Sequence, residues 1–241
     1  MRLVIISFIL LISFNIYTKE ISILVDIPGE GVEIINHTKV KVHYIGKLTD
    51  GKEFDNSYKR GEPIKFQIGT RQVIQGWEIG LLGMKIGGKR TILIPPDMAY
   101  GNNGVKDLIP PNSSLIFDIE IVDAVLPGYR IITSDQVKLA LTGNYIIIDI
   151  RTQKERNSTG IIPGSIELTA FDEFGNFIPS FLNYFNKNTN QNDKIIFVSN
   201  KGEISEILAN GFVESLQYKN IYSVKGGIQS LIDNDFQLVK N

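Results

Sequence analysis

The sequence contains no cysteine and only two histidines, and these absences exclude several kinds of chemistry. Without cysteine, the protein has no disulfide framework, no thiolate nucleophile and no thiolate-bound metal. The histidines, His37 and His43, lie beside the first expected strands, and the ligand spacings typical of hard-metal sites are also absent. We therefore expect no metal site and no cofactor.

The chain also lacks an excess of charge of either sign. Its 25 basic and 26 acidic residues give a net charge of -1, which argues against a broad nucleic-acid-binding face. We expect no nucleic-acid partner. The length of 241 residues, with 43% hydrophobic residues, is enough to build two domains with separate cores.

The N-terminal segment has the layout of a targeting sequence. In "MRLVIISFILLISFNIYTKE", a positive Arg2 precedes an apolar stretch from Leu3 to Phe14, and polar residues follow. The stretch is shorter than the roughly 20 apolar residues that span a bilayer, and no Ala-x-Ala cleavage site follows it. We expect 1–18 to be a signal peptide, with an uncleaved anchor or a buried helix as alternatives. The protein is then exported: periplasmic, secreted, or held at a membrane only if this segment is uncleaved.

Residues 20–125 show the pattern of an α+β domain with many antiparallel strands. β-branched, alternating segments predict strands over 21–27, 39–46, 64–69, 89–96 and 113–124. The Asp50-Gly51 pair predicts a hairpin. Apolar residues at helical spacing from Trp77 to Met84 predict a short helix that Gly87-Gly88 ends. The domain is expected to end near Ala124.

Trp77 is the only tryptophan of the chain and lies in "QVIQGWEIGLLGM", residues 72–84. A single tryptophan usually fills a hydrophobic core, and this role needs no ligand. The residues around it suggest a second role.

Three stretches carry a resemblance to a known family. "VHYIGKLTDGKEFDNS", "IKFQIGTRQVIQGWEIGLLGMKIGGKRTILIPPDMAYG" and "IPPNSSLIFDIEIVDA" resemble the FKBP family, the macrolide-binding peptidyl-prolyl cis-trans isomerases. The resemblance implies a twisted antiparallel sheet over a short helix, with an apolar pocket between them. It also implies that Trp77 forms the floor on which a proline ring rests, while its other side packs into the core.

The site residues follow from the positions that match the family's pocket. The expected catalytic residues are Asp55, Tyr100, Trp77, Phe54 and Ile74, and the expected substrate-binding residues are Tyr44, Phe66, Val73, Phe117 and Ile109. The resemblance assigns an acid to Asp55, a hydroxyl that contacts the substrate carbonyl to Tyr100, and a backbone N–H donor to Ile74. Ile64 and Val105 depart from the family's common residues at the rim, which affects the peptide preference.

The resemblance implies non-covalent catalysis that assists the folding of exported proteins. The expected partners are proline-containing unfolded or partly folded proteins, and macrolide inhibitors. The alternative is a module that binds proline motifs, or acts as a chaperone, without significant turnover.

Beyond Ala124 the pattern changes to alternating strands and helices. Pro127-Gly128 indicates a linker over 126–132, and 133–241 then form a second domain. Helices are predicted over 133–143 and 203–218, strands over 145–150, 194–199 and 220–224, and Lys225-Gly226-Gly227 is expected to close the unit. Continuous apolar strands predict an α/β domain whose parallel sheet is covered by helices on both faces.

The second domain resembles the rhodanese family through "YIIIDIRTQKERNSTGIIPGSIEL" and "KNIYSVKGGI". The family's active loop usually reads Cys-x-x-Gly-x-Arg-Ser, and here the corresponding loop is "SNKGEIS", residues 199–205. Ser199 replaces the cysteine and Ile204 replaces the arginine, whereas Gly202 and Ser205 remain. Ser199, Gly202 and Ser205 thus form a pseudo-active loop.

These replacements remove the chemistry of the family. A serine oxygen cannot carry a persulfide, and Ser199 has no histidine base within its own domain. We therefore expect the second domain to bind a protein partner or serve as a scaffold without catalysis. The loop's N–H groups, with Lys201 nearby, would hold an anion such as a carboxylate, or the loop is a structural remnant.

Overall fold

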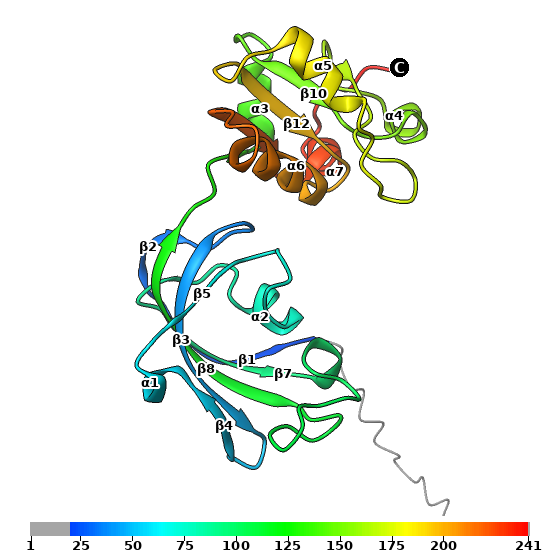
Figure 1. Cartoon of the computed structure of the whole chain (residues 1–241). Helices are drawn as coiled ribbons and strands as arrows, with labels where there is room; N and C mark the ends of the chain where they lie inside the picture. Colours follow the sequence, from blue (N-terminus) through cyan, green and yellow to red (C-terminus); the bar gives the residue numbers. More distant parts are fainter. Residues whose placement is uncertain (1–19, 241) are drawn as a thin grey trace, which may run out of the picture. The chain divides into compact units, whose positions relative to one another are not determined.

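The computed structural model describes residues 20–240, and its main division into two compact units falls between Asp123 and Ala124 (Figure 1). The expected signal peptide or anchor over 1–18 lies outside the described residues. Over 20–240, no helix combines the length and the apolar character needed to cross a membrane.

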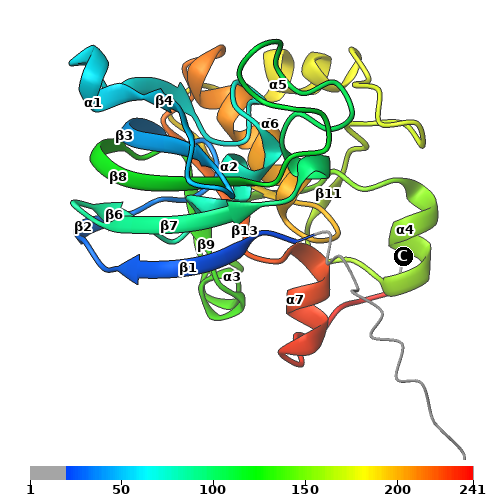
Figure 2. The same cartoon turned by 90° about the horizontal axis from the view of Figure 1, so that it is seen from below.

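The first unit is built on a six-stranded sheet. Its strands are β1 (Ser22–Ile27), β3 (Lys39–Leu48), β4 (Glu53–Asn56), β5 (Ile64–Gln67), β7 (Lys89–Ile94) and β8 (Leu115–Val125). The order is β1-β7-β8-β3-β4, with β5 also paired to β3, and Figure 2 shows these five strands side by side. The β1–β7, β7–β8 and β3–β4 pairs are antiparallel. β2 (Glu30–Glu33) and β6 (Lys85–Ile86) form a separate two-stranded sheet.

One face of this sheet forms the core of the first unit. Alternate side chains of β3 are buried, among them Val40, Val42 and Tyr44. The same period of two buries Leu115 and Phe117 in β8. Since successive side chains of a strand point to opposite faces, Tyr44 and Phe117 both point inward.

α2 (Gln75–Gly80) lies on the concave side of this sheet (Figure 1). The sequence predicted a longer helix, from Trp77 to Met84 and ended by Gly87-Gly88, and this prediction was wrong. The chain leaves the helix at Leu81, Gly83 adopts a φ of 77°, and the Met84 N–H bonds to the Leu81 carbonyl in a turn. Leu81 and Met84 are still buried, so a turn produced the apolar spacing that resembled a helical face.

The second unit contains a five-stranded parallel sheet, ordered β11-β10-β12-β13-β9. The strands are β9 (Arg130–Ile132), β10 (Ile146–Asp149), β11 (Ile166–Glu167), β12 (Lys194–Val198) and β13 (Asn220–Val224). Residues 130–132, which we assigned to the linker, pair with β13 as an edge strand. The stretch between the two sheets is therefore shorter than 126–132.

Helices cover both faces of the parallel sheet, as the sequence predicted. They are α3 (Ser134–Ala140), α4 (Gln153–Thr159), α5 (Phe181–Asn188), α6 (Glu203–Glu214) and α7 (Gly227–Asp233). One core contains side chains of α5 and α6, and the other contains side chains of α3 and α7. Ile148 belongs to the first core and its neighbour Ile147 to the second, because adjacent residues of a strand face opposite ways.

Two boundaries of the second unit differ from the prediction. α6 ends at Glu214, before the expected position 218. The expected end of the unit at Lys225-Gly226-Gly227 is instead the start of α7, whose Ile228 and Leu231 are buried in the core. The fold class is nevertheless confirmed for both units.

Candidate functional site

The first unit contains a pocket of about 160 Å³ between the sheet and α2. Its lining residues come from several segments: Tyr44, Phe54, Asp55, Ile64, Gln72, Val73, Ile74, Trp77, Tyr100 and Phe117. Tyr44 lies on β3, Phe54 and Asp55 on β4, and Phe117 on β8. Eight of the ten predicted site residues are thus brought together, joined by Ile64 and Gln72.

Perpendicular aromatic rings form the floor of this pocket. The Trp77 ring is 4.9 Å from the Tyr44 ring and 5.3 Å from the Phe117 ring, centroid to centroid, at interplanar angles of 87° and 90°. Phe54 meets Phe117 in the same way at 5.7 Å. Edge-to-face pairs of this kind are favourable because the positive ring edge meets the negative ring face. The floor is therefore held rigidly on both sides of the indole.

A polar network forms one side of the pocket. The Asp55 carboxylate accepts hydrogen bonds from the Tyr44 hydroxyl and the Arg60 guanidinium, and a third from the Asn56 backbone N–H at 2.7 Å. Arg60 also donates to the Tyr44 hydroxyl at 3.1 Å and lies 5.5 Å above the Tyr44 ring. Burial, and then the hydrogen bond to Asp55, raise the pKa of Tyr44. Tyr44 is therefore a neutral donor that fixes the orientation of the carboxylate.

Arg60 is the residue of this network that the sequence reasoning missed. It is the last residue of α1 (Ser57–Arg60), a single turn whose start is capped by the Asn56 side chain, which accepts the N–H groups of Tyr58 and Lys59. This turn brings the guanidinium back to Asp55, five residues earlier in the chain. An Asn-Ser cap followed by a basic residue one turn later was the available signal.

Tyr100 and Ile74 carry polar groups at the mouth of the pocket. Tyr100 is 40% exposed, and burial followed by the charge of Asp55 raises the pKa of its hydroxyl. The Ile74 carbonyl accepts the Trp77 N–H at 2.9 Å at the start of α2. Within residues 20–240, the Ile74 N–H makes no hydrogen bond, which leaves it available to an acceptor.

Two predicted substrate-binding residues lie outside this lining. Phe66 is buried in β5, with 7% of its surface exposed. Ile109 is also buried and lines a different hollow, of about 310 Å³, with Lys52 and the loop from Asn103 to Pro111. Neither residue is among those that line the pocket.

The three residues of the pseudo-active loop lie together in the second unit, between β12 and α6. The Ser199 hydroxyl oxygen accepts the backbone N–H groups of Gly202 at 3.1 Å and Ser205 at 3.3 Å. The hydroxyls of Ser199 and Ser205 are 3.0 Å apart, and that of Ser223 is 2.8 Å from Ser205. Ser205 donates to the Gly202 carbonyl at 2.8 Å. Two of the loop's backbone N–H groups thus already donate hydrogen bonds to a side chain of the same loop.

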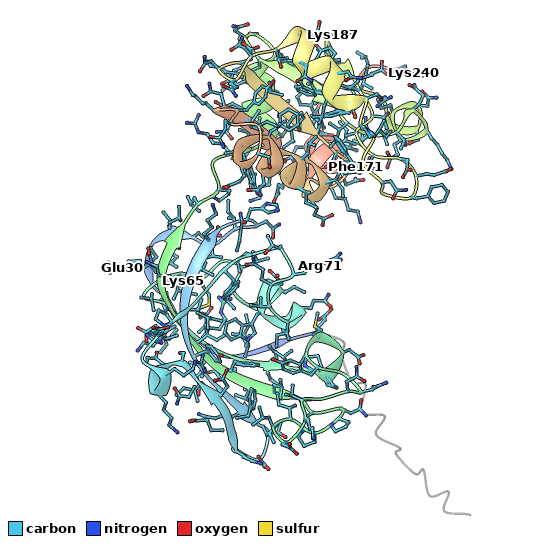
Figure 3. All side chains as sticks on the ribbon, in the orientation of Figure 1. Glu30, Lys65, Arg71, Phe171, Lys187 and Lys240 are labelled. Carbon is cyan, nitrogen blue, oxygen red and sulfur yellow. The ribbon has the colours of Figure 1, made fainter. Side chains whose placement is uncertain are left out.

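A hollow of about 810 Å³ opens above this loop, and we call it the second-domain hollow. Its wall includes Ile150, Phe171, Ile204 and Ile207, together with Glu155 and Ser199. Phe171, labelled in Figure 3, comes from the segment that follows β11. All of its lining residues lie within the second unit.

Comparison with known proteins identifies both units. The model of the FKBP-type peptidyl-prolyl cis-trans isomerase family matches residues 31–122, and that of the rhodanese-like domain matches residues 133–234. FK506-binding protein 1A of Neurospora crassa is 56% identical over 95 residues, which are 39% of this chain and 79% of that protein. Peptidyl-prolyl cis-trans isomerase FPR2 of Saccharomyces cerevisiae is 48% identical over 107 residues, 43% of this chain and 79% of that protein.

A third relative is matched over a smaller share of its own length. The chloroplastic peptidyl-prolyl cis-trans isomerase FKBP13 of Arabidopsis thaliana is 43% identical over 120 residues, 45% of this chain and 58% of that protein. A crystal structure of AtFKBP13 matches with a TM-score of 0.40 and 43% identity, covering 44% of this chain and 91% of that one. By the sequence matches over its first unit, the chain belongs to the FKBP-type peptidyl-prolyl cis-trans isomerases, and it carries a rhodanese-like domain after the isomerase domain.

Proposed function

We propose that the chain assists the folding of exported proteins by isomerising X-Pro bonds in the aromatic pocket of its first unit. The observation that carries this proposal is the set of perpendicular rings of Tyr44, Trp77 and Phe117 beside the Asp55 carboxylate. In this role the indole supports the pyrrolidine ring of the substrate.

The proposed catalysis needs no nucleophile. Rotation about a peptide bond has a barrier of ~18–20 kcal/mol because the amide is stabilised by resonance. Twisting the bond reduces the charge on the carbonyl oxygen, so a dry, apolar pocket favours the twisted state over the planar one. Lowering the barrier by ~5–7 kcal/mol raises the rate by about four to five decades.

The polar groups would orient the substrate. The Ile74 N–H and the Tyr100 hydroxyl would donate hydrogen bonds to substrate carbonyls while the residue before proline rotates. In this mechanism Tyr44 and Tyr100 transfer no proton. Their raised pKa values keep both hydroxyls protonated at neutral pH. Arg60 would hold Asp55 and Tyr44 in place.

The proposed substrates are proline-containing unfolded or partly folded proteins, and macrolides would bind in the same pocket as inhibitors. Export is supported by the sequence of residues 1–18, with Arg2 before an apolar stretch. The protein would act in the periplasm, outside the cell, or at a membrane if that segment stays attached.

We propose that the rhodanese-like domain is a non-catalytic module for binding or scaffolding. Sulfur transfer requires a persulfide on a cysteine, and the chain contains none. The Ser199 hydroxyl accepts hydrogen bonds from two backbone N–H groups and lies beside the Ser205 hydroxyl. None of these groups is a base that could activate Ser199 as a nucleophile.

A proline-limited refolding assay with the chain from residue 20 onward tests the isomerase proposal. We expect faster refolding that a macrolide inhibitor abolishes. Tyr100→Phe should reduce the rate, whereas Tyr58→Phe, the same chemical change outside the pocket, should leave it unaltered. A refolding rate equal to the uncatalysed one, with macrolide binding retained, would instead favour the alternative of a proline-binding module without turnover.

A further inference from the structure

The second-domain hollow has lost the features that attract anions. The Ser199 hydroxyl already accepts hydrogen bonds from the backbone N–H groups of Gly202 and Ser205, so these groups are not available to an anion. Arg151 lines the hollow, but its side chain is 1% exposed and bonds to the buried Asp149 carboxylate at 2.6 and 2.9 Å. Since a guanidinium paired in this way presents no free charge, the floor of the hollow is close to neutral.

Large apolar side chains are exposed on two of the segments that line the hollow. Ile204 and Ile207 lie almost one turn apart on α6, and 45% and 52% of their surfaces are exposed. Phe174, between the lining residues Glu173 and Gly175, is 81% exposed. Apolar side chains grouped around a concave site are typical of a surface that binds a partner.

The exposed phenylalanine is held on a structured turn. The Asp172 carboxylate accepts the N–H groups of Phe174 at 2.9 Å and Asn176 at 2.8 Å, and the Asn176 side chain at 3.0 Å. These bonds keep Phe174 at the tip of the turn. Because the backbone of this turn is already ordered, it loses little conformational entropy when a partner covers it.

The charges around the hollow are mainly negative. Four carboxylates line it, those of Glu155, Asp172, Glu173 and Glu203, and two ammonium groups, those of Lys154 and Lys201. With Arg151 neutralised by Asp149, an excess of two negative charges faces the hollow. A site with this balance attracts cations.

Two of these carboxylates are held in the ionised form. Hydrogen bonds from Asn176 lower the pKa of Asp172. Burial alone would raise the pKa of Glu155, but hydrogen bonds from Thr152 and Asn200 lower it overall. Their charges therefore persist below neutral pH.

We propose that the second-domain hollow binds an extended polypeptide segment in which a large apolar side chain stands next to a lysine or arginine. The apolar side chain contacts Ile204 and Ile207, and the basic group lies near Glu173 and Glu203. Phe174, on the turn between Glu173 and Gly175, is available to a partner that extends beyond the hollow. This inference rests on the proposed binding role of the rhodanese-like domain and specifies its partner. That partner is unfolded polypeptide, which binds whether or not it contains proline. A chain with both sites holds a client while its prolines are isomerised, since linked sites raise the effective concentration of the client.

Fluorescence anisotropy with a labelled ten-residue peptide of alternating leucine and lysine tests the inference on the chain from residue 20 onward. The peptide contains no proline. A peptide of the same length with glutamate in place of lysine serves as the control. We expect the lysine peptide to bind at least about tenfold more tightly, a difference of about 1.4 kcal/mol. A saturating macrolide should not displace it.

Two matched pairs of variants locate the site. Ile207→Gln should weaken binding about fivefold or more, whereas Leu139→Gln, at an apolar residue of α3 that is 73% exposed, should leave it unchanged. Glu203→Lys should weaken binding of the lysine peptide, whereas Glu62→Lys on the first unit should have no effect. Because all four positions are exposed, the variants are expected to fold.

Three results would overturn the inference: no binding of the lysine peptide, equal binding of both peptides, or displacement by the macrolide. An affinity for the lysine peptide that is unchanged in Ile207→Gln and Glu203→Lys would overturn it as well. Isomerase activity is measured in the same preparations, so that activity without peptide binding refutes only the inference, and absence of activity refutes the proposed function.

Discussion

The indole of Trp77 stands perpendicular to the ring of Phe117, with 5.3 Å between their centroids, and only 3% of the Trp77 surface is exposed. The same indole lines the aromatic pocket of the first unit. One side of Trp77 therefore packs into the core while another faces the pocket, and both roles suggested by the sequence are compatible with this arrangement.

Replacing Trp77 by alanine should affect both roles. We expect Trp77→Ala to lower macrolide affinity and to reduce the free energy of unfolding by ~3–5 kcal/mol, as for other buried large aromatic residues. Calorimetric titration with a macrolide and urea unfolding measure the two effects. Trp77→Phe, which retains a ring, serves as a folded control. Unchanged macrolide affinity in a folded Trp77→Ala variant would mean that the indole serves the core alone.

Two helical glycines should respond in opposite ways to alanine. A Cβ atom at Gly76 would lie 2.4 Å from a carbon of the buried Ile94 side chain, whereas a Cβ at Gly211 would have no atom within 4 Å. Gly76→Ala should therefore destabilise the first unit by ~1–3 kcal/mol through overpacking. Gly211→Ala should stabilise the second unit by ~0.5–1 kcal/mol, because alanine favours the helix.

Trp77 fluorescence separates these effects, because the only tryptophan lies in the first unit. Gly76→Ala should shift the fluorescence-detected urea transition to lower concentration. Gly211→Ala should leave that transition in place and raise the stability seen by far-UV circular dichroism. A Gly76→Ala transition equal to that of the wild type would contradict the proposed clash.

The sequence predicted the parts of the fold that depend on local pattern. The alternation in β3 and the Asp50-Gly51 hairpin are read from neighbouring residues, and both are present. The end of α2 was predicted wrongly because Leu81 and Met84 remain buried in the turn that follows the helix. Apolar spacing reports burial, and over so few residues it does not distinguish a helix from a turn.

Features set by contacts between distant segments escaped prediction. β9 is three residues long and is stabilised by pairing with β13, some 90 positions later in the chain. The contact of Arg60 with Tyr44 joins residues 16 positions apart. The chain of hydroxyls from Ser199 through Ser205 to Ser223 links the loop after β12 to α6 and β13. Such contacts depend on the tertiary fold, which periodicity does not encode.

Tyr58 should make the stability of the first unit depend on alkaline pH. Burial, and then the hydrogen bond to Glu120 at 2.6 Å, raise the pKa of the Tyr58 hydroxyl to about 12. Because the folded pKa exceeds the unfolded value of about 10, the stabilisation is complete below pH ~10 and is lost as pH rises through about 12. Urea unfolding at pH 8 and pH 11 should therefore show a larger loss of stability in the wild type than in Tyr58→Phe. Equal losses would mean that Tyr58 titrates normally.

The rhodanese-like domain has a serine at the position where sulfur transfer requires a cysteine. We expect the chain to have no thiosulfate:cyanide sulfurtransferase activity, because Ser199 stands where a persulfide would have to form. Ser199→Cys alone should restore little, since Ile204 provides no guanidinium to orient an anionic donor. Its side chain is 45% exposed at the hollow, so Ile204→Arg should be tolerated by the fold.

The double variant Ser199→Cys/Ile204→Arg distinguishes two interpretations of this loop. Partial activity would mean that the N–H groups of Gly202 and Ser205, which now bond to Ser199, still form a competent cradle for sulfur. An inactive but folded double variant would mean that the loop has adopted a purely structural or partner-binding geometry. Sulfur transfer above background by the unmodified chain would contradict the prediction, since no atom of the loop can carry the persulfide.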